Sequence, residues 1–533
     1  MRAFIRSGDP FVWLAGSALA LCLLMIAGLV GVVLYNGLGF FWARDLVRVE
    51  LNGGERAMGE LINRQLIAEG EDDYRVQLKV GNRDVYGLDF RWIPESQITA
   101  RSYPAAAVTI ERAEWGNLYG TVSSLYSEGE LVAREEERVS ALLAEAMAAA
   151  EESRERMSEL EHGPLRVIDD ELESLRLRER TLKNRALNDE LAQVEDQRRK
   201  LWAEYDQIAQ QLTALRHEAE RHELAVAVEG RGQEVRVNVN DIVRIYHPNE
   251  ITTADKAVLY GAKAWEFLSG TPRESNTEGG IFPALFGTVM MVMLMTLAVV
   301  PFGVLAALYL REYARQGVLV RTVRIAVNNL AGVPSIVFGM FGLGFFVYGV
   351  GGTIDQLFYQ DSLPTPTFGT GGILWASLTL ALLTLPVVIV TTEEALSAVP
   401  SQLRDGSLAL GSTKLQMIWR VVLPSALPGI LAGVILATAR GAGEVAPLMI
   451  TGVVKLAPDL AIDALWPFLH LERKFMHLGF HIYDVGFQSP NVEAARPMVY
   501  ATTLLLLAVV LVLNLTAIVV RNRLRKRYAY STF

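Results

Sequence analysis

Six long apolar runs constrain this chain more than any other feature of its sequence. A helix needs about 20 consecutive apolar residues to cross the hydrocarbon core of a bilayer, and six segments reach that length. The segments are Phe11–Tyr35, Ile281–Leu310, Val323–Val350, Gly372–Val390, Leu427–Gly452 and Met498–Val520. The sequence therefore predicts an integral membrane protein with six transmembrane helices.

The first apolar run has some features of a secretory signal, because Arg2 and Arg6 precede it. It is longer than the roughly 7–15 residues of a signal-peptide core, and no small-x-small cleavage site follows it. We therefore interpret residues 1–36 as a retained transmembrane anchor helix.

Basic residues near the helix ends predict the orientation, because Lys and Arg accumulate on the cytoplasmic side. Residues 521–533 form a strongly basic tail. The basic residues between the second and third runs are Arg311, Arg315, Arg321 and Arg324. We expect a multi-pass protein of a bacterial inner membrane with both termini in the cytoplasm. Residues 36–280 would then lie in the periplasm and residues 391–426 in the cytoplasm.

Residues 37–250 have the composition of a soluble periplasmic insertion. Tyr74–Val80 and Val235–Val239 alternate apolar and polar residues, as half-buried strands do. Such stretches lie before residue 129 and after residue 225. The economical interpretation is one β-rich unit interrupted by a coiled coil over residues 130–225.

A heptad pattern supports the coiled coil, since apolar residues spaced by seven form the seam between paired helices. The main row is Leu187, Val194, Leu201, Ile208 and Leu215, with Leu191, Tyr205 and Leu212 as its companions. A weaker seam upstream consists of Val139, Leu142, Ala146, Ala149 and Ser153. Two turns are compatible with these rows: one at Gly163-Pro164, or one near Asn184–Asn188 with Gly163-Pro164 only a kink. A spacer and a docking element are equally compatible functions.

Residues 251–280 are expected to form an interfacial helix and a linker. Thr252–Leu268 is amphipathic, and its Tyr260 and Trp265 suit the membrane surface.

The segment 391–424 carries a spaced pattern between two apolar runs. It begins with Glu393-Glu394-Ala395-Leu396 and continues through Asp405-Gly406-Ser407, Gly411, Val421 and Leu423-Pro424. A residue without Cβ turns the chain sharply after a helix, so we expect two short helices at an angle, joined at Gly411. Such a rigid knob can sit in a cleft of a soluble partner.

This pattern resembles the EAA loop of ABC importer permeases, although Asp405-Gly406-Ser407 stands where the family has Glu-Ala-Ala. Further stretches are similar to the permease subunits of phosphate-specific ABC importers, of the PstA type. These stretches are Gly279–Ile281 with Gly287-Thr288, Asn329–Gly339 and Ala439–Leu448. The resemblance covers residues 279–527 well and does not cover most of residues 36–270.

The resemblance implies a type I ABC importer permease fold for residues 281–520, within an all-α membrane domain carrying the periplasmic insertion. It implies import of inorganic phosphate, with three protein partners besides membrane lipid. The partners are an ABC ATPase subunit, a second permease subunit of the PstC type and a periplasmic phosphate-binding protein. The coupling loop to the ATPase would comprise Glu393, Glu394, Asp405, Gly406, Ser407, Gly411, Leu423 and Pro424.

Several kinds of chemistry are not expected in this chain. It contains no Walker A pattern for ATP phosphates, so ATP and Mg would be bound by the partner ATPase. A formal net charge of −9 argues against a nucleic-acid binder. Cys22 is the single cysteine, and His477 and His481 lack a third suitably placed ligand, so we expect no metal site.

Arg440 and Glu444 interrupt an apolar run and lie four residues apart, which would place them on one helix face. A charge facing lipid costs at least about 2.5–3.5 kcal/mol, so both should face the bundle or a pore. A guanidinium matches phosphate oxygens. The resemblance assigns this Arg-x3-Glu stretch to the translocation path, and a structural ion pair is the alternative.

Two other functions fit parts of the sequence. One is a permease for another oxyanion, such as sulfate, molybdate or phosphonate. The other is a membrane signalling protein with an outer coiled-coil sensor, for which no cytoplasmic output domain is evident.

Overall fold

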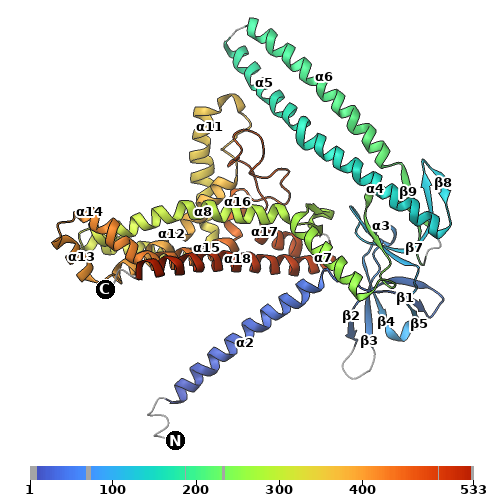
Figure 1. The fold of residues 1–533 in the computed structure, drawn as a ribbon, viewed down its shortest axis with the longest axis horizontal. Helices are drawn as coiled ribbons and strands as arrows, with labels where there is room; N and C mark the ends of the chain where they lie inside the picture. The colour runs from blue at the N-terminus through green and yellow to red at the C-terminus, as the bar shows by residue number, and fades with distance from the viewer. Residues whose placement is uncertain (1–8, 68–73, 186–187, 231–233, 490, 530–533) are drawn as a thin grey trace. The chain divides into compact units, whose positions relative to one another are not determined.

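The computed structural model describes residues 9–67, 74–185, 188–230, 234–489 and 491–529, which form two compact units (Figure 1). The membrane unit comprises Met1–Phe40 and Ile281–Phe533. The second unit, Phe41–Gly280, is here called the inserted domain.

The membrane unit is helical. Its α-helices are α2 (Asp9–Gly39), α8 (Phe282–Leu308), α9 (Val318–Leu330), α10 (Ser335–Phe341), α11 (Gly352–Phe358), α12 (Ile373–Ser397), α13 (Ser401–Ala409), α14 (Lys414–Met417), α15 (Leu423–Gly443), α16 (Ala446–Thr451), α17 (Leu478–Tyr483) and α18 (Val492–Ala529). The π-helical turns η5 (Tyr309–Tyr313), η6 (Gly342–Gly351), η8 (Ile418–Val422) and η9 (Asp484–Gln488) extend several of them.

Six continuous helices in the described residues are long and apolar enough to span a membrane, which agrees with a multi-pass protein. They are Phe11–Gly39, Phe282–Tyr313, Ser335–Phe358, Ile373–Ser397, Lys414–Gly443 and Val492–Leu524.

Two of the predicted span boundaries that differ from the structure do so because the helix is interrupted there. The third span begins at Ser335 and not at Val323, since Pro334 lacks an N–H donor and restricts the residue before it. The segment before it forms the separate helix α9. The fifth span ends at Gly443 and not at Gly452, and Glu444 after it has extended backbone angles.

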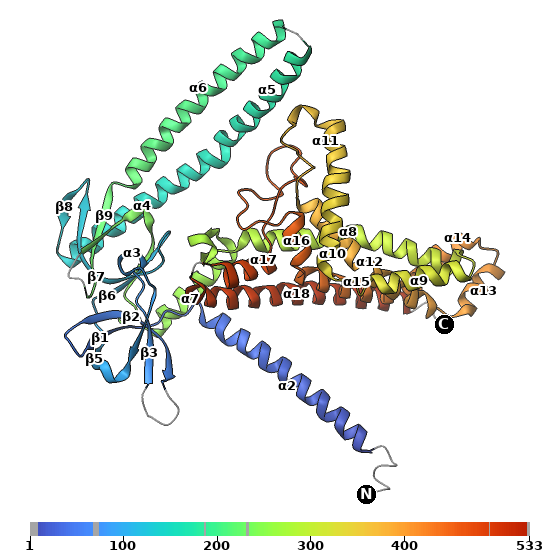
Figure 2. The same cartoon turned by 180° about the vertical axis from the view of Figure 1, so that it is seen from behind.

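Helix α12 forms the centre of the membrane unit. In the most apolar stretch of α12, 67% of the residues are buried, whereas only 6% are buried in the corresponding stretch of α2. It packs beside α8 and α15, which lie next to it in both views (Figures 1 and 2). Gly303 of α8 lies against Val388, and Gly433 of α15 lies against Thr391. These glycines let the helices approach closely.

The inserted domain contains two main antiparallel sheets. The first has the order β4-β3-β2-β1-β5 and the second β10-β9-β7-β6-β11, with β8 paired to β7. The strands are β1 (Leu46–Leu51), β2 (Arg56–Leu66), β3 (Tyr74–Lys79), β4 (Phe90–Pro94), β5 (Ile98–Ser102), β6 (Ala107–Arg112), β7 (Leu118–Ser127), β8 (Glu130–Ala133), β9 (His222–Ala227), β10 (Glu234–Asn238) and β11 (Ile242–Tyr246). A short hairpin, β12 (Pro272–Arg273) with β13 (Glu278–Gly279), follows. The second sheet combines strands from before and after the helical excursion.

The excursion consists of α4 (Glu136–Leu160), the π-helical turn η2 (Glu161–Leu165), α5 (Arg166–Arg185) and α6 (Asn188–Ala219). Helix α4 continues through η2 into α5, so the chain does not turn at Gly163-Pro164. Pro164 has no backbone N–H to donate, and the wider π-turn accommodates this missing hydrogen bond without ending the helix. Helices α5 and α6 lie side by side (Figures 1 and 2), so the chain reverses between them. This agrees with a turn near Asn184–Asn188, although residues 186–187 lie outside the described residues.

The predicted seams fit the hairpin only partly. Val194 of α6 is buried, whereas Leu187 lies outside the described residues. On α4 the buried residues are Val139, Leu143, Ala146, Ala150 and Ser153. Ala149 is exposed, so its prediction as a seam residue is wrong, whereas Leu142 is half-buried and packs against the core of the second sheet. The start of α4 packs on the second sheet, where a spacing of three and four residues keeps one face buried.

Helix α7 (Thr253–Ser269) agrees with the amphipathic helix predicted before the second span. Thr252 caps it in a reciprocal arrangement with Asp255. Tyr260 and Phe267 pack on Phe41, with ring centroids 5.7 and 5.3 Å apart. Its position on a membrane surface stays a prediction.

The close packing of α15 on α12 gives a test of the membrane unit. In Gly433→Ala the new Cβ would overlap the Thr391 hydroxyl, and overpacking costs about 1–3 kcal/mol. We expect a lower Tm for the purified protein in detergent. Gly443→Ala, on the same helix and with open space beside it, is the matched control and should not lower Tm. Equal Tm values for the two variants would contradict this packing.

Two buried histidines predict how stability depends on pH. Burial lowers the pKa of His477 from 6.5 to about 3, and burial together with Lys455 lowers that of His481 to about 4. The unfolded chain binds protons near pH 6.5 and the folded chain does not, so stability is present above pH 6.5 and falls toward pH 4. We expect Tm to fall between pH 7 and pH 5.

The control is the double variant His477→Asn, His481→Gln. Asn keeps a side-chain acceptor at the start of α17, where the His477 Nδ1 accepts from the Gly479 N–H. The variant should show a smaller fall in Tm over the same pH range. An unchanged pH dependence would show that other groups cause it.

Candidate functional site

Helices α13 and α14 form the two-helix knob that the sequence predicts. Gly411 between them has φ +83, in the left-handed region that favours glycine. The Gly411 N–H donates to Leu408 O at 2.9 Å. The Ser412 hydroxyl donates to Ser407 O at 2.7 Å, and Thr413 caps α14. The turn is therefore fixed by its own hydrogen bonds.

Polar contacts fasten the knob to the end of the second span. Arg404 donates to Leu396 O and Val399 O, each at 2.6 Å, and pairs with Glu312 at 3.2 Å. The Lys414 ammonium donates to Glu312 O. The two helices of the knob are thus tied to α12 and η5, so a displacement of the knob is transmitted to both.

The outer surface of the knob combines polar residues with several exposed apolar ones. Asp405 and Gly406 are exposed, and nothing lies within 4 Å of a Cβ built at Gly406. Leu410 is 91% exposed. We define the knob surface as the exposed apolar residues Leu408, Leu410, Leu415 and Trp419. An apolar patch at a helix tip is typical of a protein interface.

The second helix of the knob is not a separate short helix, as was expected, because it continues through Leu423 and Pro424 into α15. The helix runs without interruption from Lys414 to Gly443, and η8 precedes the proline. A π-turn removes the need for the proline N–H. One helix therefore joins the knob to Arg440.

Arg440 lies in the last turn of α15, with its Nε 3.6 Å from the Glu444 Oε1. The predicted pair is present, but the reason given for it is wrong. The helix ends at Gly443, so Glu444 does not share a helix face with Arg440. Their side chains are 36% and 21% exposed, so the pair is not sealed in the core.

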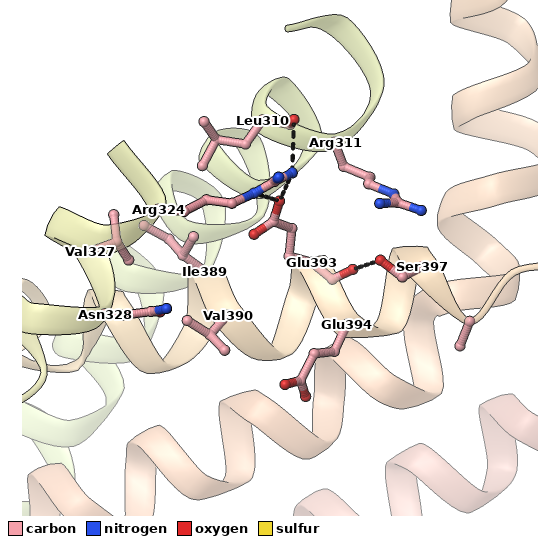
Figure 3. Close-up of a pocket in the computed structure, with 11 residues that line it drawn as sticks. Leu310, Arg311, Arg324, Val327, Asn328, Ile389, Val390, Glu393, Glu394 and Ser397 are labelled. Carbon is pink, nitrogen blue, oxygen red and sulfur yellow. Dashed lines mark hydrogen bonds and ion pairs between the residues drawn. The ribbon is translucent and has the colours of Figure 1, made fainter. Parts of the chain in front are cut away.

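Glu393 and Glu394 lie in the last turns of α12 and not in the knob. The Arg324 Nε donates to the Glu393 Oε1 at 2.7 Å, and Arg324 belongs to α9 (Figure 3). A cavity of about 600 Å³ surrounds this pair. Sequence reasoning missed the cavity, since residues 324 and 393 are far apart in the chain and only the fold brings them together.

His470 is held in a cluster of charged residues. Its ring nitrogens lie 3.1 Å from Asp463 and 3.2 Å from Glu472, and Arg473 pairs with Asp463 at 2.5 Å. The cluster fixes the segment between α16 and α17.

The chain matches a family of known transport proteins. Residues 299–530 match the family model described as "Binding-protein-dependent transport system inner membrane component". The chain is 39% identical over 172 residues to the phosphate transport system permease protein PstA of Mycobacterium leprae, covering 32% of this chain and 51% of that protein. Identity to the PstA protein of Yersinia pestis is 35% over 187 residues, covering 35% and 57%. The matches thus span a little over half the length of these relatives.

A longer match involves a permease of unspecified substrate. The probable ABC transporter permease protein YqgI of Bacillus subtilis is 32% identical over 228 residues, covering 42% of this chain and 71% of that protein. With the knob and the spanning helices, these matches lead to one assignment: the chain belongs to the ABC transporter permease family of multi-pass membrane proteins.

Proposed function

We propose that this chain is the permease subunit of an ATP-driven importer that moves inorganic phosphate across a bacterial inner membrane. The observation that carries the proposal is the single helix from Lys414 to Gly443, which joins the knob surface to Arg440. The similarity to two PstA proteins supports phosphate as the substrate.

The knob is the docking element for a separate ABC ATPase. Its exposed leucines offer an apolar contact, and its ties to Glu312 and Leu396 transmit movement into the second and fourth spans. ATP and Mg bind to that ATPase, and this chain performs no bond chemistry. Both termini and the knob lie in the cytoplasm.

Arg440 compensates the charge of the anion within the translocation path. A guanidinium presents a planar fork to phosphate oxygens. Glu444 orients this fork and competes with the anion, which prevents permanent binding. A second permease subunit of the PstC type completes the pore, and a periplasmic phosphate-binding protein delivers the substrate. The inserted domain lies in the periplasm.

The same geometry suits another tetrahedral oxyanion, such as sulfate, molybdate or phosphonate. Excess unlabelled anion added to a labelled-phosphate uptake assay separates these substrates. Competition by sulfate or molybdate equal to that by phosphate would exclude a phosphate-specific importer. A signalling protein is disfavoured by the permease family match.

Replacing Arg440 tests the translocation path. Arg440→Gln removes the charge and should abolish phosphate uptake while the ATPase still co-purifies. Arg440→Lys keeps the charge without the fork and should lower uptake by roughly tenfold, which equals about 1.4 kcal/mol. The control is Arg496→Gln, at an exposed position of α18. Uptake by Arg440→Gln at the rate of the unmodified protein would exclude the pore role.

Replacing Leu410 tests docking. Leu410→Asp puts a charge on the knob surface without touching the core and should weaken ATPase co-purification by roughly tenfold, as for a buried interface residue. Leu456→Asp changes an exposed leucine between α16 and α17 and should retain the ATPase. Retention of the ATPase by both variants would rule out docking through Leu410.

A further inference from the structure

Three elements, η5, α9 and the last turns of α12, form the cavity around the Arg324–Glu393 pair. Its polar lining residues are Arg311, Arg324, Asn328, Glu393, Glu394 and Ser397. At about 600 Å³ it is much larger than a single water. It has room for a small hydrated anion.

The Arg324 guanidinium is held within this cavity by contacts with the protein itself. Besides the Glu393 carboxylate, it contacts Gln316 Oε1 at 3.0 Å and Leu310 O at 3.5 Å. The guanidinium is therefore positioned by three partners, and its charge is balanced by one of them.

The Arg311 guanidinium, in contrast, is available to bind a ligand. Within the described part of the chain it makes no ion pair or hydrogen bond, and its side chain is exposed. Figure 3 shows its guanidinium beyond Glu393, toward Ser397, with no interaction drawn to it. Asn328 lies at the other end of the cavity beside Val390 (Figure 3). N–H donors that have no partner among the described residues thus flank the ion pair on two sides.

We infer that this cavity is a second anion site, separate from the Arg440–Glu444 pair, and that Arg311 binds an oxyanion of the phosphate class there. The inference rests on the proposed function, because phosphate import would bring the free ion to the cavity. A lipid phosphate headgroup has the same chemistry and is the other source. Glu394, which also lines the cavity, keeps the binding weak enough for release.

Glu393 acts in this site as a positioning residue. It neutralises Arg324, so the cavity presents one free guanidinium and not a pair. Two arginines around one phosphate would form several charge-assisted hydrogen bonds and hold the ion tightly. The last turn of α12 also connects to the knob through the Arg404 contact with Leu396 O. Movement of the knob therefore changes the site directly.

The test is an arginine-modification footprint on the full chain in nanodiscs of neutral lipid. Phenylglyoxal labelling is measured by mass spectrometry with inorganic phosphate and with chloride at equal ionic strength. Saturating phosphate should slow labelling of Arg311 by roughly fivefold or more. Arg315, exposed four residues away and outside the cavity lining, is the control in the same molecule and should not be protected.

A second arm distinguishes the source of the anion. If nanodiscs containing anionic lipid protect Arg311 without added phosphate, the ligand is a lipid headgroup. If only inorganic phosphate protects it, the ligand is the free ion. If Arg311 is labelled at the same rate under all conditions, or if Arg315 is protected as much as Arg311, the proposed anion site is wrong.

Glu393→Gln gives a second measurement. Releasing Arg324 should lower the phosphate concentration for half-maximal protection by roughly tenfold, since charge-assisted bonds are the strong ones. An unchanged concentration would contradict the positioning role. Labelled-phosphate uptake is measured in parallel. If phosphate protects Arg311 but is not taken up, the proposed transport function is wrong and the anion site stands. If phosphate is taken up but does not protect Arg311, the anion site is wrong and the transport function stands.

Discussion

The packing of α12 between α8 and α15 is the constraint on which the membrane unit depends. Gly303 and Gly433 bring the neighbouring helices close to Val388 and Thr391. Lipid tails give little hydrophobic drive for helix association, so contact at this distance supplies the stabilisation. The same helix carries Glu393 at its end and leads through Pro400 into the knob. The helix packing, the cavity and the knob are therefore all connected to α12.

The spans and the knob were readable from the sequence because each depends on local chemistry. Long apolar runs must be satisfied as helices in lipid, and Gly411 adopts a backbone angle that other residues avoid. The misplaced boundaries have local causes as well. Pro334 separates α9 from the third span, and the helix break after Gly443 is hidden within an apolar run.

Other features were out of reach because they depend on tertiary contacts. Arg324 and Glu393 are 69 residues apart, and their pairing requires α9 to lie against α12. On α4 the buried residues include Leu143 and Ala150 where Leu142 and Ala149 were predicted. Both sets have heptad spacing, and the packing of Leu143 on the second sheet, which the spacing does not reveal, selects the buried face. The pairing of Arg440 with Glu444 was expected, but spacing alone did not show that the helix ends between them.

The helix end at Gly443 places Arg440 and Glu444 on two different segments of the chain. Arg440 rides on the helix that starts in the knob, whereas Glu444 leads into α16, whose Pro447 packs against Gly339 of α10. A rotation of the first helix about its axis would carry the guanidinium along a circle and leave the carboxylate in place. The distance between the two charges would therefore change with such a rotation, since only one of them lies on that helix.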